Sequence, residues 1–338
     1  MRAWYLNDTN GPDSYILGEL ETPEPGPEGV RVRLRASALN HLDLWTSLGA
    51  PAPKSFPHVT GADGAGTIDA VGADVIGWTV GDEVVVDPSI PHGPPTDGIP
   101  YGGLLGILGE HEWGTLAEYV IVPASNLITK PPSLDWHRAA AYGLVTGTAY
   151  RMLRRARLSA GDVLLVVGVG GGVSSAGMSI GQVLGADVYV TSTKPHKIER
   201  ALALGAKGGF DSTGEFAKEL KAAAGRGADV VLENVGPATW NQSMRALALG
   251  GRLVTCGSTT GPNVEVSVPA LFFKHHEILG STMFDRDDFE AVTAMVGSGE
   301  LAVHVDEVFA FNELPAALAR MAAGEQLGKI VIDHASDG

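Results

Sequence analysis

The chain has 338 residues, which exceeds the about 250–300 residues that one hydrophobic core usually serves, so we expect two domains. Its formal net charge of −15 at pH 7 disfavours broad binding to nucleic-acid phosphates. The single cysteine, Cys256, excludes an internal disulfide framework and a zinc site built from four cysteines.

The apolar segments are short, and Asn7 and Asp8 interrupt the start of the chain before an apolar core can form. We therefore expect neither a secretory signal nor a membrane helix, which needs about 20 apolar residues. A cytoplasmic protein without a membrane partner is the expected class.

The N-terminal part of the chain shows short strand-like segments, punctuated by Gly, Asp and Pro. Examples are residues 61–68, 76–81 and 83–86. Strands at this spacing predict a β-rich, barrel-like domain. Residues 87–113 are rich in Pro and Gly without a clear period, which predicts a long loop of the kind that often carries function.

After Pro131, continuous apolar segments alternate with helical patterns, which predicts a parallel sheet covered on both faces, a doubly wound α/β arrangement. The six expected strands are residues 162–168, 186–192, 209–211, 229–234, 252–256 and 277–282. A last strand at 328–332 could rejoin the N-terminal domain. We expect one domain from residues 1–130 with 285–338, and a second from residues 131–284.

A glycine cluster, Gly168-Val-Gly-Gly-Gly172, stands between the first strand and the first helix of that sheet. Glycines there let backbone N–H groups approach a pyrophosphate at the start of the helix. The match to Gly-x-Gly-x-x-Gly is imperfect because Val173 takes the place of the third glycine. The expected cofactor contacts in this turn are Gly168, Gly170, Gly171, Gly172 and Val173.

The end of the second strand should select the nicotinamide nucleotide, since an acid there would bind the ribose of NAD. The chain instead offers hydroxyls at Ser192 and Thr193 and charge at Lys194 or Lys197. These groups predict NADP(H). The alternative is a solvated lysine pair in the first turn of the next helix.

Together these features resemble the medium-chain dehydrogenase/reductase superfamily. The landmarks are residues 61–66, 77–82 and 114–119, the glycine turn, and Gly328-Lys329. The resemblance covers essentially the whole chain and implies a GroES-like barrel domain, a six-stranded Rossmann domain and pairing into a homodimer.

Zinc-dependent members of this superfamily hold their catalytic metal with a Cys, the His of a Gly-His-Glu motif and typically a second Cys. The corresponding positions here are Asn40, Ala62 and Tyr142, and Pro91 takes the first place of the structural zinc lobe. Carboxamide and methyl groups do not replace thiolate or imidazole. The chain therefore resembles the zinc-free quinone oxidoreductase and enoyl reductase branches, and we expect no metal.

The resemblance suggests catalytic roles for two of these residues. The Asn40 amide is expected to donate to a substrate carbonyl or to the cofactor ribose, unless it only caps a turn. Tyr142 either donates a proton or fills the space of the metal. Asp43 and Asp63 either orient this loop or are turn acids, and we favour a turn acid for Asp63.

Further cofactor contacts are implied by position. They are His41, Thr146, Asn234, Gly257, Ser258 and Lys329. His41 and Lys329 match places where relatives put a basic residue on the pyrophosphate, although His41 is equally compatible with a surface histidine.

Without a metal to stabilise an alkoxide, reduction of a quinone or an activated C=C bond is the favoured chemistry. We therefore expect a zinc-independent, NADPH-dependent oxidoreductase acting on a small electrophile. The alternatives are a metal-free alcohol or aldehyde dehydrogenase and a non-catalytic NADPH-binding protein.

Overall fold

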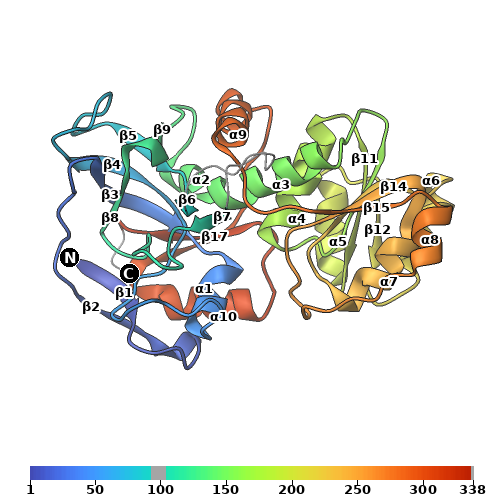
Figure 1. The fold of residues 1–338 in the computed structure, drawn as a ribbon, viewed down its shortest axis with the longest axis horizontal. Helices are drawn as coiled ribbons and strands as arrows, with labels where there is room; N and C mark the ends of the chain where they lie inside the picture. The colour runs from blue at the N-terminus through green and yellow to red at the C-terminus, as the bar shows by residue number, and fades with distance from the viewer. Residues whose placement is uncertain (93–103, 336–338) are drawn as a thin grey trace. The chain divides into compact units, whose positions relative to one another are not determined.

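The computed structural model describes residues 1–92 and 104–335, and the chain forms two compact units (Figure 1). The first unit comprises Met1–Leu144, Asp285–Gly299 and Val303–Gly338. The second unit comprises Val145–Phe284 with Glu300–Ala302. Each unit is built around its own sheet.

The first unit is β-rich. Its seven-stranded sheet has the order β16-β17-β3-β4-β5-β9, with β8 paired to β3. These strands are β3 (Gly29–Ala38), β4 (Asp63–Val71), β5 (Glu83–Val86), β8 (Tyr119–Pro123), β9 (Leu127–Thr129), β16 (Val305–Ala310) and β17 (Lys329–Asp333). β17 pairs antiparallel with β3, so the C-terminal segment joins the N-terminal sheet, as predicted.

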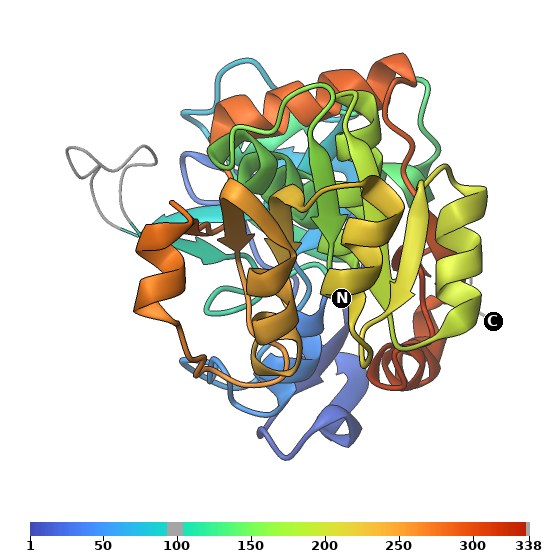
Figure 2. The ribbon, with the colours of Figure 1, turned by 90° about the vertical axis from the view of Figure 1, so that its right-hand side faces the viewer.

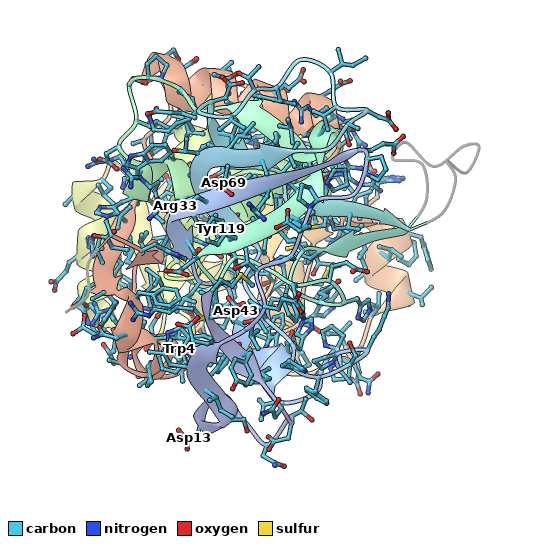
Figure 3. The ribbon with its side chains drawn as sticks, turned by 90° about the vertical axis from the view of Figure 1, so that its left-hand side faces the viewer. Trp4, Asp13, Arg33, Asp43, Asp69 and Tyr119 are labelled. Carbon is cyan, nitrogen blue, oxygen red and sulfur yellow. The ribbon has the colours of Figure 1, made fainter. Side chains whose placement is uncertain are left out.

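Strand β3 shows why this sheet has one apolar face. The Val30 and Val32 side chains of β3 are fully buried on one face of the sheet. Arg31, between them, pairs with Asp69 of β4 and lies over the Tyr119 ring of β8. Figure 3 shows Arg33, Asp69 and Tyr119 on these three neighbouring strands. The alternation of arginine with aliphatic residues therefore belongs to a half-buried strand.

Smaller elements complete the first unit. β1 (Arg2–Leu6) pairs antiparallel with β2 (Tyr15–Glu19), and β6 (Ser89–His92) pairs with β7 (Leu104–Ile107). The helices are α1 (His41–Ser47), α2 (Trp136–Ala141), α9 (Arg286–Ser298) and α10 (Leu314–Ala322). Helix α3 (Gly143–Arg155) begins at the end of the unit's first segment.

Two local predictions in this unit were wrong. Residues 76–81 form irregular backbone with a bend and a turn rather than a strand, and the glycines at 77 and 81 adopt positive φ, which interrupts an extended chain. The Trp78 indole there donates to the carbonyl of Ala124. The expected loop 87–113 contains the β6–β7 ribbon, in which Pro91 pairs with Leu105. Residues 93–103 of that loop lie outside the described part of the chain.

The second unit contains six parallel strands in the order β12-β11-β10-β13-β14-β15 (Figure 2). The strands are β10 (Val163–Val166), β11 (Asp187–Ser192), β12 (Gly208–Asp211), β13 (Ala228–Glu233), β14 (Leu247–Thr255) and β15 (Glu277–Gly280). The helices are α4 (Gly172–Val183), α5 (Pro195–Ala203), α6 (Phe216–Ala224), α7 (Pro237–Ala246) and α8 (Val268–Phe273).

This sheet confirms the predicted doubly wound, six-stranded Rossmann arrangement. Counted from β10, the order is 3-2-1-4-5-6, so the strand order reverses between β10 and β13. Open α/β sheets bind ligands at the carboxyl ends of the strands beside such a reversal. Within residues 1–92 and 104–335, no helix is long and apolar enough to cross a bilayer.

Candidate active site

Asn40 lies at the N-cap of α1, where its backbone N–H donates to Asp43 Oδ2 over 2.8 Å. Its side chain does not cap the helix. The amide Nδ2 donates to Asp63 Oδ2 over 3.0 Å, and Oδ1 accepts from the Lys329 ammonium over 2.7 Å. The turn-capping alternative therefore explains the backbone of Asn40 but not its carboxamide.

Asp63 and Lys329 form a buried ion pair. Lys329 Nζ is 2.8 Å from Asp63 Oδ2, and the two side chains are 4% and 1% exposed. The second oxygen, Asp63 Oδ1, accepts the backbone N–H of Leu144 over 2.7 Å. The interpretation of Asp63 as a turn acid was wrong, because every oxygen of its carboxylate is committed inside the unit.

A second carboxylate, Asp43, lies beside this cluster. Its burial raises the pKa to about 6, although the N–H of Asn40 and the charge of Lys329 act in the opposite direction. The Tyr15 hydroxyl donates to the backbone oxygen of Asp43 over 3.0 Å. The cluster thus holds two carboxylates around one ammonium.

Tyr142 ends helix α2 and is fully buried. Thr293 Oγ1 donates to the Phe289 carbonyl over 2.8 Å, so it accepts the Tyr142 hydroxyl hydrogen over 3.0 Å. Burial raises the pKa of Tyr142 above its usual value, and its ring stacks on that of Phe289. These contacts favour the space-filling role over the role of proton donor.

The side chains at the positions of the family's zinc ligands do not fit a zinc ion. Asn40 is bonded to an ammonium, Ala62 has no donor atom, and the Tyr142 hydroxyl is held by Thr293. Over the described ranges, no group of three or more His, Cys, Asp and Glu residues is arranged to hold a metal.

The glycine turn of the second unit fits a pyrophosphate. Gly168 has a φ of +73° and donates its N–H to Thr191 Oγ1, which ties the turn to β11. Gly171 is the N-cap of α4, where no side chain caps the helix and an added Cβ would meet nothing within 4 Å. The first N–H groups of this helix are therefore presented to solvent or ligand.

The turns after β13 and β14 come together at the same edge of the sheet. The Asn234 carbonyl accepts from Thr259 N–H over 3.2 Å, and an added Cβ at Gly236 would approach Ser258 to 3.2 Å. Asn234 Nδ2 also donates to Ser174 Oγ over 3.3 Å, which links this turn to α4. The structure thus gathers the expected contacts Gly168 to Val173, Asn234, Gly257 and Ser258.

Glu233 was missed by sequence reasoning, although it directly precedes Asn234. Its buried carboxylate accepts from the N–H groups of Val235 and Gly236 and from the hydroxyls of Thr239 and Ser243. It therefore shapes the turn that carries Asn234. Hydroxyl residues at helical spacing after this acid, Thr239 and Ser243, were the available signal.

At the end of β11, Ser192 is buried and its Oγ accepts the N–H of Lys194 over 3.1 Å, while Thr193 is exposed. Lys197 is also buried, in the first turn of α5, which leaves Lys194 better placed than Lys197 to meet a phosphate. Asp211, the neighbour of Ser192 in the ladder, is an acid that sequence reasoning missed.

The remaining expected contacts have other surroundings. His41 is the first residue of α1, and its ring centroid is 6.0 Å from that of Trp45. Thr146 is buried within α3. Lys329, expected on a pyrophosphate, instead directs its ammonium to Asn40 and Asp63.

Two family models match the chain. The alcohol dehydrogenase GroES-like domain matches residues 26–132, and the zinc-binding dehydrogenase model matches residues 172–298. The chain belongs to the medium-chain dehydrogenase/reductase superfamily. Its homologues are oxidoreductases, so this chain is an oxidoreductase of that superfamily with a nicotinamide cofactor.

Among curated relatives, the crotonyl-CoA carboxylase/reductase of Cereibacter sphaeroides is 30% identical over 95% of this chain and 84% of that protein. The quinone oxidoreductase of Pseudomonas aeruginosa is 28% identical over 95% of this chain and 96% of its own length. These two relatives of the chain are thus named for an unsaturated CoA thioester and for a quinone.

Solved structures agree on the fold. An NAD-dependent alcohol dehydrogenase is 36% identical with a TM-score of 0.93, covering 99% of this chain and 100% of its own. A 2-octenoyl-CoA carboxylase reductase, solved with NADP and 2-octenoyl-CoA, is 27% identical with a TM-score of 0.90. The match covers 100% of this chain and 88% of that protein. The solved structures that resemble this chain thus include an NAD-dependent enzyme and an enzyme solved with NADP.

Proposed function

We propose that the protein is a zinc-independent, NADPH-dependent oxidoreductase that delivers hydride to a quinone or an α,β-unsaturated carbonyl compound. The observation that carries this proposal is the Asn40 carboxamide, bonded to Asp63 and Lys329 at a position where zinc-dependent relatives have a metal ligand. The crotonyl-CoA and quinone reductases among the relatives support the substrate class.

The bound nicotinamide supplies the hydride. The β-carbon of an enone accepts it, the electron pair of the C=C bond moves toward the carbonyl oxygen, and Asn40 Nδ2–H stabilises the charge that develops there. One such donor contributes about 3–4 kcal/mol when it is well placed. Water then protonates the α-carbon, because the Tyr142 hydroxyl is buried and already donates to Thr293.

NADPH is the proposed cofactor because hydroxyls and a lysine, rather than an acid, end strand β11. Ser192, Thr193 and Lys194 are the proposed 2′-phosphate contacts. The carboxylate of Asp211 on the next strand, β12, opposes binding of a 2′-phosphate. The preference for NADPH over NADH is tested by the variant Lys194→Glu. This variant should raise the KM for NADPH at least tenfold and leave the KM for NADH nearly unchanged.

The function is tested by NADPH consumption with 3-buten-2-one and with 1,4-benzoquinone, together with elemental analysis of the purified protein. We expect turnover with at least one of these probes and less than stoichiometric zinc. Asn40→Ala should lower kcat about 100-fold, the loss expected for one oxyanion donor, with NADPH affinity retained. One tightly bound zinc per chain would refute zinc independence.

A metal-free alcohol dehydrogenase is the second candidate, favoured by the 36% identity to an NAD-dependent alcohol dehydrogenase. It predicts oxidation of simple alcohols with NAD and no reduction of 3-buten-2-one. NADPH binding without turnover of either substrate class would instead indicate a non-catalytic binding protein.

We also propose that two copies pair through β15. This strand is last in the six-stranded order and pairs with β14 in the described chain, and exposed apolar side chains lie nearby. These are Leu249, Val268, Phe272 and Phe273. Phe273→Asp should convert a dimer into a monomer in light scattering; a monomeric parent protein would refute this pairing.

A further inference from the structure

The carboxamide orientation of Asn40 is decided by the two charged groups beside it. With Oδ1 toward Lys329 Nζ at 2.7 Å and Nδ2 toward Asp63 Oδ2 at 3.0 Å, both contacts are favourable hydrogen bonds. A reversed amide would place NH2 against the ammonium and the oxygen against the carboxylate. The Lys329–Asp63 pair thus stabilises one of the two amide orientations and opposes the other.

The same contacts leave hydrogen-bonding capacity on the NH2 side of Asn40. Nδ2 carries two hydrogens, and besides the bond to Asp63 it makes a long contact of 3.4 Å to the Ala38 carbonyl. A contact of that length is weak. An ammonium on Oδ1 also polarises the amide, so its N–H groups become stronger donors.

Burial gives this arrangement its rigidity. Lys329 and Asp63 are separated by 266 residues in sequence, yet both side chains are almost completely enclosed. A buried pair is stable only when its remaining polar atoms are also bonded, and Asp63 Oδ1 meets this condition through Leu144 N–H. The pair is therefore a fixed frame for Asn40 rather than a mobile surface contact.

We propose that Lys329 is a positioning residue, whose ammonium orients and polarises the Asn40 carboxamide so that Nδ2 donates to the substrate oxygen. This inference rests on the proposed function, in which Asn40 is that donor. It differs from a pyrophosphate contact, because the ammonium already donates to Asn40 and Asp63 from a position that is 4% exposed. Lys329 then affects kcat rather than cofactor affinity.

A double-mutant cycle shows whether Lys329 affects turnover through Asn40 or independently of it. Lys329→Met should lower kcat with 3-buten-2-one about 10–100-fold, part of the loss expected for one oxyanion donor, with the KM for NADPH within threefold. In the Asn40→Ala background, Lys329→Met should cause little further loss. Effects that multiply, or a rise in the KM for NADPH alone, would overturn the proposal.

The same cycle distinguishes the two proposals. If Asn40→Ala turns over like the parent protein, the donor role in the proposed function fails, and the role of Lys329 fails with it. If Asn40→Ala is impaired while the two substitutions multiply, the proposed function stands and only the positioning role fails.

Lys329→Met leaves the Asp63 carboxylate unpaired and can prevent folding, so a rescue experiment is needed. Lys329→Ala removes the atoms of propylamine, and propylammonium chloride should restore kcat at least several-fold, whereas 1-propanol of the same length should not. Equal rescue by 1-propanol would show that the side chain only fills space. The double variant with Asn40→Ala should show no rescue.

Lys130→Met is a matched control. Lys130 is also a buried lysine of the first unit, 3.1 Å from Glu83, but it lies outside the Asn40 cluster. It should lose stability without losing kcat. A measurement without turnover completes the test: in ¹⁵N-asparagine-labelled protein, the Asn40 side-chain amide hydrogens should shift upfield in Lys329→Met. Unchanged resonances would contradict the polarising contact.

Discussion

The two units differ in how the polar groups of their candidate sites are bonded. In the first unit, Asn40, Asp63 and Lys329 satisfy one another inside the protein. In the second unit, Gly171 opens helix α4 without a capping side chain and with free space around its Cα. The first arrangement suits the donor role proposed for Asn40, whereas the second suits the proposed binding of an anionic pyrophosphate.

The largest expected effect comes from breaking the enclosed pair. Asp63→Leu leaves the Lys329 ammonium buried without its carboxylate, which should lower the free energy of unfolding by about 3–5 kcal/mol. Urea denaturation measures this loss. Glu83→Leu is the control, because Glu83 is more than half exposed and its pair with Lys130 should contribute less than about 1 kcal/mol. Similar losses in both variants would contradict the comparison.

The pH dependence of stability should also differ between the units. The pKa of Asp43 is raised by burial from 3.8 to about 6, so its contribution to folding is most favourable below pH 3.8 and is lost as the pH rises through about 6. Between pH 4 and pH 7, the stability of Asp43→Asn relative to the parent protein should therefore rise by about 2 kcal/mol. Urea denaturation across this pH range measures the difference.

Asp211 of the second unit is the control for that series. It is exposed, and hydrogen bonds from Thr213 lower its pKa, so its contribution appears as the pH rises and is lost on acidification. Asp211→Asn should therefore show the opposite sign of pH dependence. Parallel curves for the two variants would refute the assignment of a buried, raised pKa to Asp43.

A capping side chain at Gly171 should affect cofactor binding and stability in opposite directions. Gly171 has φ −70° and ψ 154°, a backbone that suits a capping carboxylate. Gly171→Asp should stabilise the fold by only about 0.3 kcal/mol, because Gly is itself a tolerated N-cap residue. It should weaken NADPH binding about 100-fold relative to Gly171→Asn, as for like charges about 6 Å apart at an effective dielectric of about 20.

Both variants are compared by thermal denaturation and by NADPH fluorescence titration. Asn caps the helix as well as Asp does and has nearly the same size, so the difference between them isolates the charge. Equal NADPH affinities in the Asp and Asn variants would show that no phosphate approaches this turn.

The smallest expected effect is that of Tyr142→Phe. The substitution removes one buried hydrogen bond to Thr293, which should lower stability by about 1 kcal/mol. Turnover should stay within a few-fold of the parent protein, because the stacked ring still fills the site against Phe289. A loss of kcat of about 100-fold with unchanged stability would restore the phenol as the proton donor.

Residues close together in sequence explain which features were predictable. The six strands of the second unit and the turn from Gly168 to Gly172 were predicted, because apolar runs and glycine clusters act through neighbouring residues. The segment 76–81 was wrongly predicted as a strand, because that prediction also used only the local pattern. Its local pattern did not reveal that the Trp78 indole bonds to Ala124 far along the chain.

The amino-acid sequence by itself determined the six strands of the second unit through local apolar runs and turns, and its resemblance to the superfamily indicated which side chains stand in place of zinc ligands. Only the tertiary structure decided what Asn40 does with its carboxamide. Its partners Asp63 and Lys329 come from two strands, β4 and β17, and their charges select an amide orientation only after folding excludes water from both. No local pattern around Asp63 or Lys329 carries that information.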